Sequence, residues 1–471
     1  MSTVQGLAPA AEVPRNASRR FYFTAWRWHF YAGLYVAPFL LMLAVTGLVM
    51  LWSAVFIGRD GEKYYRVTPQ AETVSVSRQA EAAFMTAPDG QIVQYIAPRT
   101  ADGSAVFRIN QGDASSMVAV DPYTAEVLGT WERHNGLYDL ANTIHGTLML
   151  GTLGDRLIEI AAGFGVVLIV TGLYLWWPRD GQGFASVLVP NFAAKGRALW
   201  KSLHLTVGFY VAAILLVFLL SGLTWAGIWG EKMTQAWSTF PAEKWDNVPL
   251  SDETHASMNH GGVKNVPWTL EQTPMPVSGS AAGVTGTPDG QPVDIDAIVT
   301  LARSLGFDQR FQLAFPGDAT GVWTLSRDTM SNDSANPLSD RTVHIDQYTG
   351  KILADVGFAD YGAAGKAMAV GIAFHEGDMG LWNLALVTVF CLSIIFLSVS
   401  GIVMWWKRRP KGAARLVAPV VSEPGPLWKT GAIVMVAVSL LFPLSGAVLV
   451  GVLLLDLLLV RQIKPLKRAI S

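Results

Sequence analysis

Four uninterrupted apolar stretches dominate this chain, and each is long enough to cross a lipid bilayer, which takes about 20 apolar residues in a helix. A helix is one of the two structures that satisfy every backbone hydrogen bond inside the hydrocarbon. We therefore expect a mostly α-helical membrane protein with four core transmembrane helices. The predicted spans are residues 30–52, 157–177, 204–229 and 382–406.

A fifth apolar tract covers residues 430–460. As one straight helix it would be roughly 46 Å long, which exceeds the bilayer core of about 30 Å. Pro443 and Gly446 lie near its middle, and proline breaks the helical hydrogen-bond pattern. A C-terminal helical hairpin fits this tract better than one tilted helix.

Lysine and arginine gather on the cytoplasmic side of membrane proteins, and here they flank alternate ends of the spans. The cytoplasmic parts are then residues 1–29, 178–203, 407–429 and 461–471. The longer segments 53–156 and 230–381 face the opposite side. We expect a multi-pass protein with a cytoplasmic N-terminus and an uncleaved first span.

The first and third spans carry the same polar residues at the same offsets. Each opens with a histidine, followed by a glycine and a tyrosine, and closes with a hydroxyl residue before glycine. Ionisable side chains are costly at the membrane and are usually functional, so the two histidines form a candidate site. The copies are His29, Gly33, Tyr35, Thr46 and Gly47, and His204, Gly208, Tyr210, Ser221 and Gly222.

The second and fourth spans form another repeated pair. Each ends in a hydroxyl residue, a glycine and two tryptophans, and a histidine stands upstream at His145 or His375. The distance from histidine to tryptophans exceeds one span, and glycines are expected to break the chain between them. His145 and His375 should therefore lie at the outer membrane face, on the turn that enters each span. These glycines are Gly151, Gly154, Gly377 and Gly380.

Two imidazoles that converge from two helices provide the axial ligands that a haem iron needs. The topology pairs His29 with His204 on the inner side, and His145 with His375 on the outer side, so two haems would be stacked across the bilayer. The chain has no Cys-x-x-Cys-His motif, which indicates b-type haem. Bis-histidine ligation leaves no open iron position and favours electron transfer. The alternative is that these are interfacial or helix-capping histidines.

The two outer segments repeat as well. Each has an alternating strand that ends in an aspartate turn, at Asp121 or Asp346, followed by another strand. Amphipathic helices are expected ahead of these strands, at residues 75–86 and 295–305. Each segment is therefore expected to be a small α+β module.

The remaining histidines and the cysteine are less informative. His255, Met258 and His260 form a His-x-x-Met-x-His pattern whose soft and imidazole ligands suit copper or iron, although polar loops contain such residues by chance. His134 is expected in a turn and His344 inside a strand. Cys391, the one cysteine, excludes an internal disulfide and a cysteine-rich metal site.

The order and duplication of these motifs resemble the PepSY-associated transmembrane family, whose members are known as iron-regulated membrane proteins. The resemblance covers residues 24–460 and rests on the His-x-x-x-Gly openings, the Thr/Ser-Gly endings, the Trp-Trp exits and the Asp-x-Tyr-Thr strands. It implies two PepSY-like periplasmic modules in a protein of the bacterial inner membrane. It also implies an iron-uptake enzyme of the di-haem ferric-siderophore reductase type.

The expected function is therefore reduction of a periplasmic ferric siderophore, or another ferric chelate, with release of Fe(II). No nucleotide or flavin motif is evident, so electrons should come from membrane quinol or a cytoplasmic donor. The net charge of −1 gives no reason to expect nucleic acid. The alternative is a non-redox PepSY membrane protein that binds a periplasmic ligand or metal. A transporter is less favoured, because the predicted spans hold only two carboxylates, Glu159 and Asp456.

Overall fold

The computed structural model describes residues 15–112, 114–179, 183–230, 247–258, 266, 270–288, 290–410, 416–419, 428–455, 458 and 462. The chain divides into two compact units. We call residues 1–42, 155–223 and 392–471 the helical unit, and residues 43–154 and 224–391 the sheet unit.

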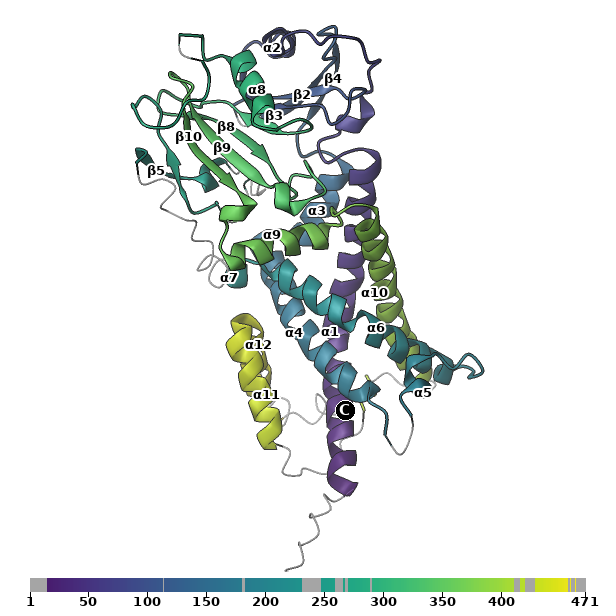
Figure 1. Ribbon diagram of the computed structural model, residues 1–471. Helices are drawn as coiled ribbons and strands as arrows, with labels where there is room; N and C mark the ends of the chain where they lie inside the picture. Colours follow the sequence, from purple (N-terminus) through teal and green to yellow (C-terminus); the bar gives the residue numbers. More distant parts are fainter. Residues whose placement is uncertain are drawn as a thin grey trace, which may run out of the picture. The chain divides into compact units, whose positions relative to one another are not determined.

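Four helices of the described chain are long and apolar enough to cross a membrane, as the sequence predicts. The third predicted span is too long by several residues, because extended backbone at Ala226 separates its helix from the short helix α7 (Gly227–Trp229). The four long helices are α1 (Arg15–Phe56), α4 (Thr152–Trp176), α6 (Arg197–Leu223) and α10 (Leu381–Arg408) (Figure 1).

The ends of α4 and α10 are built alike within the helical unit. The indole of Trp176 donates to the carbonyl of Val187 at 3.1 Å, and the indole of Trp405 donates to the carbonyl of Leu416 at 2.8 Å. Each bond holds the segment that follows the helix against the last turns of that helix. Val187 belongs to the short helix α5 (Ala185–Leu188).

The C-terminal tract forms two helices, α11 (Trp428–Leu441) and α12 (Pro443–Leu455), separated at Phe442. A Cβ atom on Gly446 would lie 2.5 Å from the Cα of Ser439, whereas residues this far apart in a straight helix are separated by roughly 10 Å. The chain therefore folds back sharply after α11, and glycine permits the close contact. Asp456 lies outside the described residues.

The sheet unit contains one antiparallel sheet of eight strands in the order β10-β9-β8-β7-β1-β2-β3-β4. Strands β5 (Leu250–Thr254) and β6 (Pro274–Pro276) form a separate pair. The eight strands are β1 (Gln91–Ile96), β2 (Ala105–Gln111), β3 (Ala114–Val120), β4 (Val127–Glu132), β7 (Gln312–Ala314), β8 (Val322–Arg327), β9 (Arg341–Asp346) and β10 (Ile352–Gly357).

The two predicted α+β segments share this sheet instead of forming separate cores. Their helices, α2 (Val76–Phe84) and α8 (Ile295–Ser304), fall where the sequence predicts and pack beside each other. One apolar core joins Ala83 of α2, Ile298 of α8 and strands from both segments. The physical reason is that β1 pairs with β7, so neither segment leaves that strand as an open edge.

The turns after β3 and β9 make the same two side-chain hydrogen bonds. A carboxylate oxygen of Asp121 accepts from the amide of Tyr123 at 2.8 Å, and Asp346 accepts from Tyr348 at 2.9 Å. Each tyrosine hydroxyl then donates to a backbone carbonyl at 2.8 Å, on Ala101 or Ala319. The sequence repeat thus marks two equivalent hairpins of one sheet.

Candidate functional site

The inner pair consists of His29 on α1 and His204 on α6, in the helical unit. Their ring centres are 6.4 Å apart and their planes are nearly perpendicular, at 88°. Nδ1 of His29 lies 3.0 Å from the hydroxyl oxygen of Thr171 on α4. Nδ1 of His204 lies 2.7 Å from the hydroxyl oxygen of Ser400 on α10. The structure therefore brings together the two histidines that the sequence repeat pairs.

The outer pair, His145 and His375, lies in the sheet unit with the same geometry. The ring centres are 6.5 Å apart and the planes meet at 83°. Nδ1 of His145 lies 2.9 Å from the hydroxyl oxygen of Thr46 on α1. The indole ring of Trp225 lies 5.9 Å from the ring of His375. The sequence pattern predicted the histidines but gave no sign of this tryptophan.

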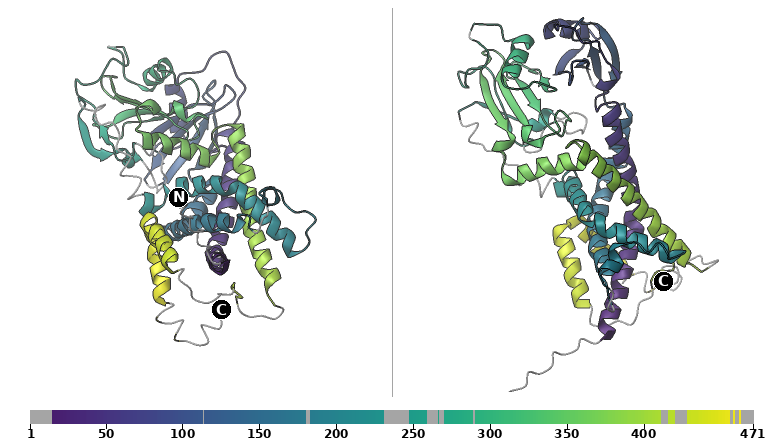
Figure 2. Two further views of the ribbon diagram at one scale, coloured as in Figure 1. Left: turned by 60° about the horizontal axis from the view of Figure 1, so that its bottom comes forward. Right: turned by 45° about the vertical axis from the view of Figure 1, so that its right-hand side comes forward.

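The structure corrects where the outer histidines sit along the chain. They lie on the last turns of two unpredicted helices, α3 (Leu137–Thr147) and α9 (Ala363–Glu376), and not on the turns that follow. Figure 2 shows α9 leading into α10 through a sharp bend. Left-handed backbone at Gly151, Gly377 and Gly380 forms the breaks, as expected of glycine. Gly154 instead lies inside α4, where a Cβ would collide with the carbonyl of Thr147.

The repeated hydroxyl-glycine dipeptides form the cradles of three imidazoles. Beside each hydroxyl bond, the Cε1 edge of the ring lies against the neighbouring glycine. An added methyl group would lie 3.2 Å from His29 at Gly172, 3.7 Å from His145 at Gly47 and 3.8 Å from His204 at Gly401. The contact is tightest at Gly172, whereas a methyl group at Gly47 or Gly401 would lie at ordinary van der Waals distance from its ring.

The ring spacing has a direct chemical meaning. Two imidazoles on opposite sides of one metal ion, each at a metal–nitrogen distance of about 2 Å, have ring centres roughly 6 Å apart. Both pairs have this spacing. Among the described residues no three histidine, cysteine or acidic side chains gather as a metal cage. Two ligands are sufficient for an iron whose other four ligands are porphyrin nitrogens, so both pairs fit haem.

The sequence matches the family described as the PepSY-associated TM region over residues 26–408. The chain belongs to this family. The match includes both histidine pairs and confirms the resemblance that the motifs indicated. No curated protein matches the sequence.

A charged cluster around Arg59 includes the residue that follows His375 in this PepSY-associated protein. The guanidinium of Arg59 lies 2.6 Å from the carboxylate of Glu376, directly after His375, and 3.6 Å from Asp378. It also lies 5.3 Å from the ring centre of Tyr138 on α3. Burial raises the pKa of Glu376 to about 7, although the charge of Arg59 opposes this shift. Sequence patterns missed this cluster because its members come from three distant segments.

A second charged cluster of the sheet unit surrounds Arg310. This side chain is 1% exposed and contacts three carboxylates. It pairs with Asp60, lies 3.3 Å from Glu62 and donates to Asp333 at 2.9 Å. The cluster joins Asp60 and Glu62, in the segment after α1, to Arg310 beside the sheet. No sequence motif predicted it.

The other histidines have structural partners. Nε2 of His255 lies 2.8 Å from Nε2 of His344 on β9, and both side chains are fully buried. Opposed ligands of one metal would place these nitrogens about 4 Å apart, so the contact is a hydrogen bond. His134 lies 3.0 Å from Asp139, and His344 lies in its predicted strand. His260, the third residue of the predicted metal-binding pattern, lies outside the described residues.

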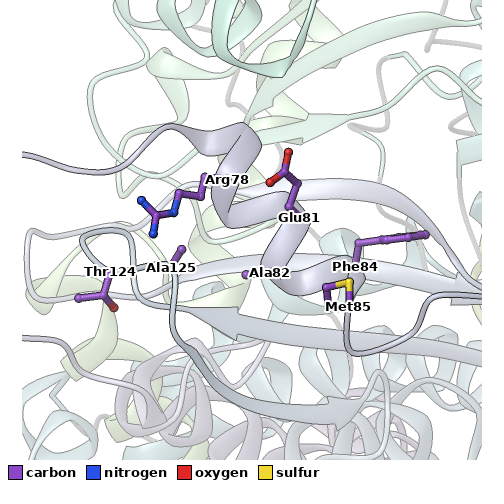
Figure 3. Close-up of a pocket in the computed structure, with 7 residues that line it drawn as sticks. All are labelled: Arg78, Glu81, Ala82, Phe84, Met85, Thr124 and Ala125. Carbon is purple, nitrogen blue, oxygen red and sulfur yellow. The ribbon is translucent and has the colours of Figure 1, made fainter.

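A surface hollow of about 510 Å³ lies over α2 and the turn between β3 and β4 (Figure 3). Phe84, Met85, Arg78 and Thr124 contribute to its lining. No histidine or cysteine lines it. The histidine pairs, and not this hollow, form the candidate functional site.

Proposed function

We propose that this protein is an inner-membrane di-haem reductase that transfers electrons to a ferric siderophore, or another ferric chelate, in the periplasm. His29 and His204 would hold one haem b, and His145 and His375 would hold the other. When bound, the haem irons would supply one-electron carriers that cycle between Fe(III) and Fe(II). The observation that carries the proposal is the shared ring spacing of the two pairs, 6.4 and 6.5 Å.

The protein residues supply the ligands and their orientation. Four histidines would hold the two haems, and hydroxyl groups on neighbouring helices hold three of the rings. Two histidines for each haem would favour electron transfer over oxygen activation. In cofactor proteins generally, the cofactor carries the chemistry and the protein binds and orients it.

The proposed direction of electron flow rests on the membrane orientation that the arginine and lysine distribution favours. In the proposed orientation the inner pair lies near the cytoplasmic surface, where quinol or a cytoplasmic donor would deliver electrons. The outer pair belongs with the sheet unit, which would face the periplasm and meet the chelate. Each ferric ion takes up one electron, and the resulting Fe(II) is held less tightly by hard oxygen donors, so the iron is released.

Haem content and pairing provide the first test. A pyridine haemochrome assay of detergent-purified protein from haem-replete cells should give about two haem b per chain. His29→Ala or His204→Ala should remove one haem, and His145→Ala or His375→Ala should remove the other. His134→Ala is the matched control and should leave both. A colourless, iron-free preparation would overturn the redox proposal and favour a non-redox membrane protein that binds a periplasmic ligand.

Vesicles test the direction and the substrate. With reductant enclosed on the cytoplasmic side, an external ferric siderophore and an impermeant Fe(II) chelator should report iron reduction outside. His204→Ala should block haem reduction from within. His375→Ala should leave the inner haem reducible but stop transfer to the siderophore. Equal siderophore reduction by His375→Ala would exclude this route.

A further inference from the structure

Three of the four proposed haem ligands share one hydrogen-bond arrangement. Each imidazole Nδ1 faces the hydroxyl oxygen of a Thr-Gly or Ser-Gly dipeptide on a different helix. The three pairs, with their nitrogen–oxygen distances, are His29 and Thr171 at 3.0 Å, His145 and Thr46 at 2.9 Å, and His204 and Ser400 at 2.7 Å.

The hydroxyl hydrogen is directed toward the helix that carries it. Thr171 donates to the carbonyl of Val167 at 2.6 Å, Ser400 to Leu397 at 3.0 Å and Thr46 to Leu43 at 3.3 Å. This bond to the preceding turn is common for helical serine and threonine. A hydroxyl has a single hydrogen, so each oxygen has only lone pairs left for the imidazole.

The imidazole must then be the donor in each nitrogen–oxygen contact, so its Nδ1 atom carries the hydrogen. In a neutral imidazole Nε2 is then the bare nitrogen.

We propose that Thr46, Thr171 and Ser400 are positioning residues that hold three imidazoles with hydrogen on Nδ1 and with Nε2 available for iron. The inference rests on the proposed function and names how its site is tuned. An acceptor at Nδ1 makes a ligating histidine more basic and fixes its ring orientation. More basic ligands stabilise Fe(III) over Fe(II), so each hydroxyl lowers the reduction potential of its own haem.

The first experiment needs no haem. Nitrogen-15 NMR of histidine-labelled, haem-free protein reports which ring nitrogen carries hydrogen, with His29 assigned by comparison with His29→Ala. Wild-type protein and Thr171→Ser should show hydrogen on Nδ1 of His29. Thr171→Val keeps the side-chain shape but removes the acceptor, and should shift the signal toward a mixture of both forms. A wild-type signal with hydrogen on Nε2 would overturn the inference.

The second experiment measures reduction potentials of the haem-loaded protein. Thr171→Val should raise the potential of the inner haem alone, by up to a tenfold change in Fe(III) preference, equivalent to about 59 mV for one electron. Thr46→Val should do the same for the outer haem alone, and Thr171→Ser should restore the wild-type value. Thr388→Val removes a similar hydroxyl bond on α10, to Leu384, and should change neither potential.

The two levels of failure are distinguishable. If the protein binds two haems and neither reduction potential changes in Thr171→Val or Thr46→Val, this inference is overturned and the reductase proposal stands. Failure of wild-type protein to bind haem would overturn the reductase proposal and, with it, the effect on potential. A shift of both potentials in Thr388→Val would show a general effect of losing a membrane hydroxyl and would also overturn the inference.

Discussion

The buried contact between His255 and His344 makes the sheet unit sensitive to acid. Nδ1 of His255 lies 2.6 Å from the carbonyl of Thr273, and Nδ1 of His344 lies 2.9 Å from the hydroxyl of Thr324. A continuous chain of hydrogen bonds results if both rings are neutral: Thr324 donates to His344, His344 to His255, and His255 to the carbonyl. A proton added to either ring breaks this chain and places a charge where no water reaches it.

The sign and size of the effect follow from the pKa. Burial lowers the pKa of His255 from 6.5 to about 4, and burial also lowers the pKa of His344, which the neighbouring His255 lowers further. The unfolded chain therefore binds protons below pH 6.5 that the folded chain rejects, so stability is present above that pH and is lost as the pH falls. Between pH 7.5 and pH 5, His255 alone should cost about 2 kcal/mol of folding free energy.

Other buried groups act in the opposite direction. Burial raises the pKa of Asp340 to about 8 and that of Asp328 to about 7, and neighbouring carboxylates add to both shifts. These acids are protonated in the folded state over a range where the unfolded chain has released its protons. Their contribution therefore grows as the pH falls toward 4. The histidine effect must be isolated by comparing variants and not by the wild-type curve alone.

The assay is hydrogen exchange in β8 and β9, measured by mass spectrometry between pH 5 and pH 7.5 and corrected for intrinsic exchange rates. The double variant His255→Gln with His344→Gln keeps polar groups but cannot titrate. Between pH 7.5 and pH 5, the free energy of opening should fall less in the double variant than in wild-type protein. The difference between the two changes should be about 2 kcal/mol or more. His134→Gln, altered at a partly exposed histidine, is the control and should follow wild type. Parallel curves for wild type and the double variant would refute the reasoning.

Three further results are expected. Arg310→Met should lower the free energy of unfolding, measured by urea titration, by about 3–5 kcal/mol, because it removes the buried cation that pairs with Asp60, Glu62 and the buried Asp333; Arg341→Met, at a partly exposed ion pair, should cost below about 1 kcal/mol in the same titration. Gly172→Ala should lower occupancy of the inner haem site in a haem titration, since the methyl group would lie 3.2 Å from His29, whereas Gly401→Ala, at 3.8 Å from its imidazole, should be tolerated; equal occupancy in both variants would contradict the steric argument. Nearly perpendicular imidazole planes should give strongly anisotropic low-spin ferric signals in electron paramagnetic resonance, and rhombic signals typical of parallel planes would contradict the observed ring geometry.

The histidine pairs were predictable because membrane chemistry makes them conspicuous. An apolar span tolerates few ionisable groups, so His29 and His204 at equal offsets stand out without any structure. The same offsets placed Thr46 and Ser221 beside glycine but did not reveal the role of Thr46, because its imidazole partner, His145, is on another helix. A sequence repeat indicates that a position is constrained, and only the fold shows which group that residue contacts.

The parts of the fold that sequence reasoning missed depend on distant contacts. Helices α3 and α9, of 11 and 14 residues, are short and precede the predicted spans. The pairing of β1 with β7 joins residues 94–96 to residues 312–314, and nothing local in either strand specifies the other. The charged residues around Arg59 and around Arg310 resemble ordinary surface residues in the sequence, and only the tertiary structure brings each set together.

Helix α1 explains why the repeated offsets are strict. It provides His29 to the inner pair and the hydroxyl of Thr46 to His145 of the outer pair. One residue more or fewer between them would turn the hydroxyl by about 100° around the helix relative to the histidine. A span that serves two sites therefore constrains its own length as well as its residues. The equal spacing of His204 and Ser221 in α6 is what a second helix under the same constraint would show.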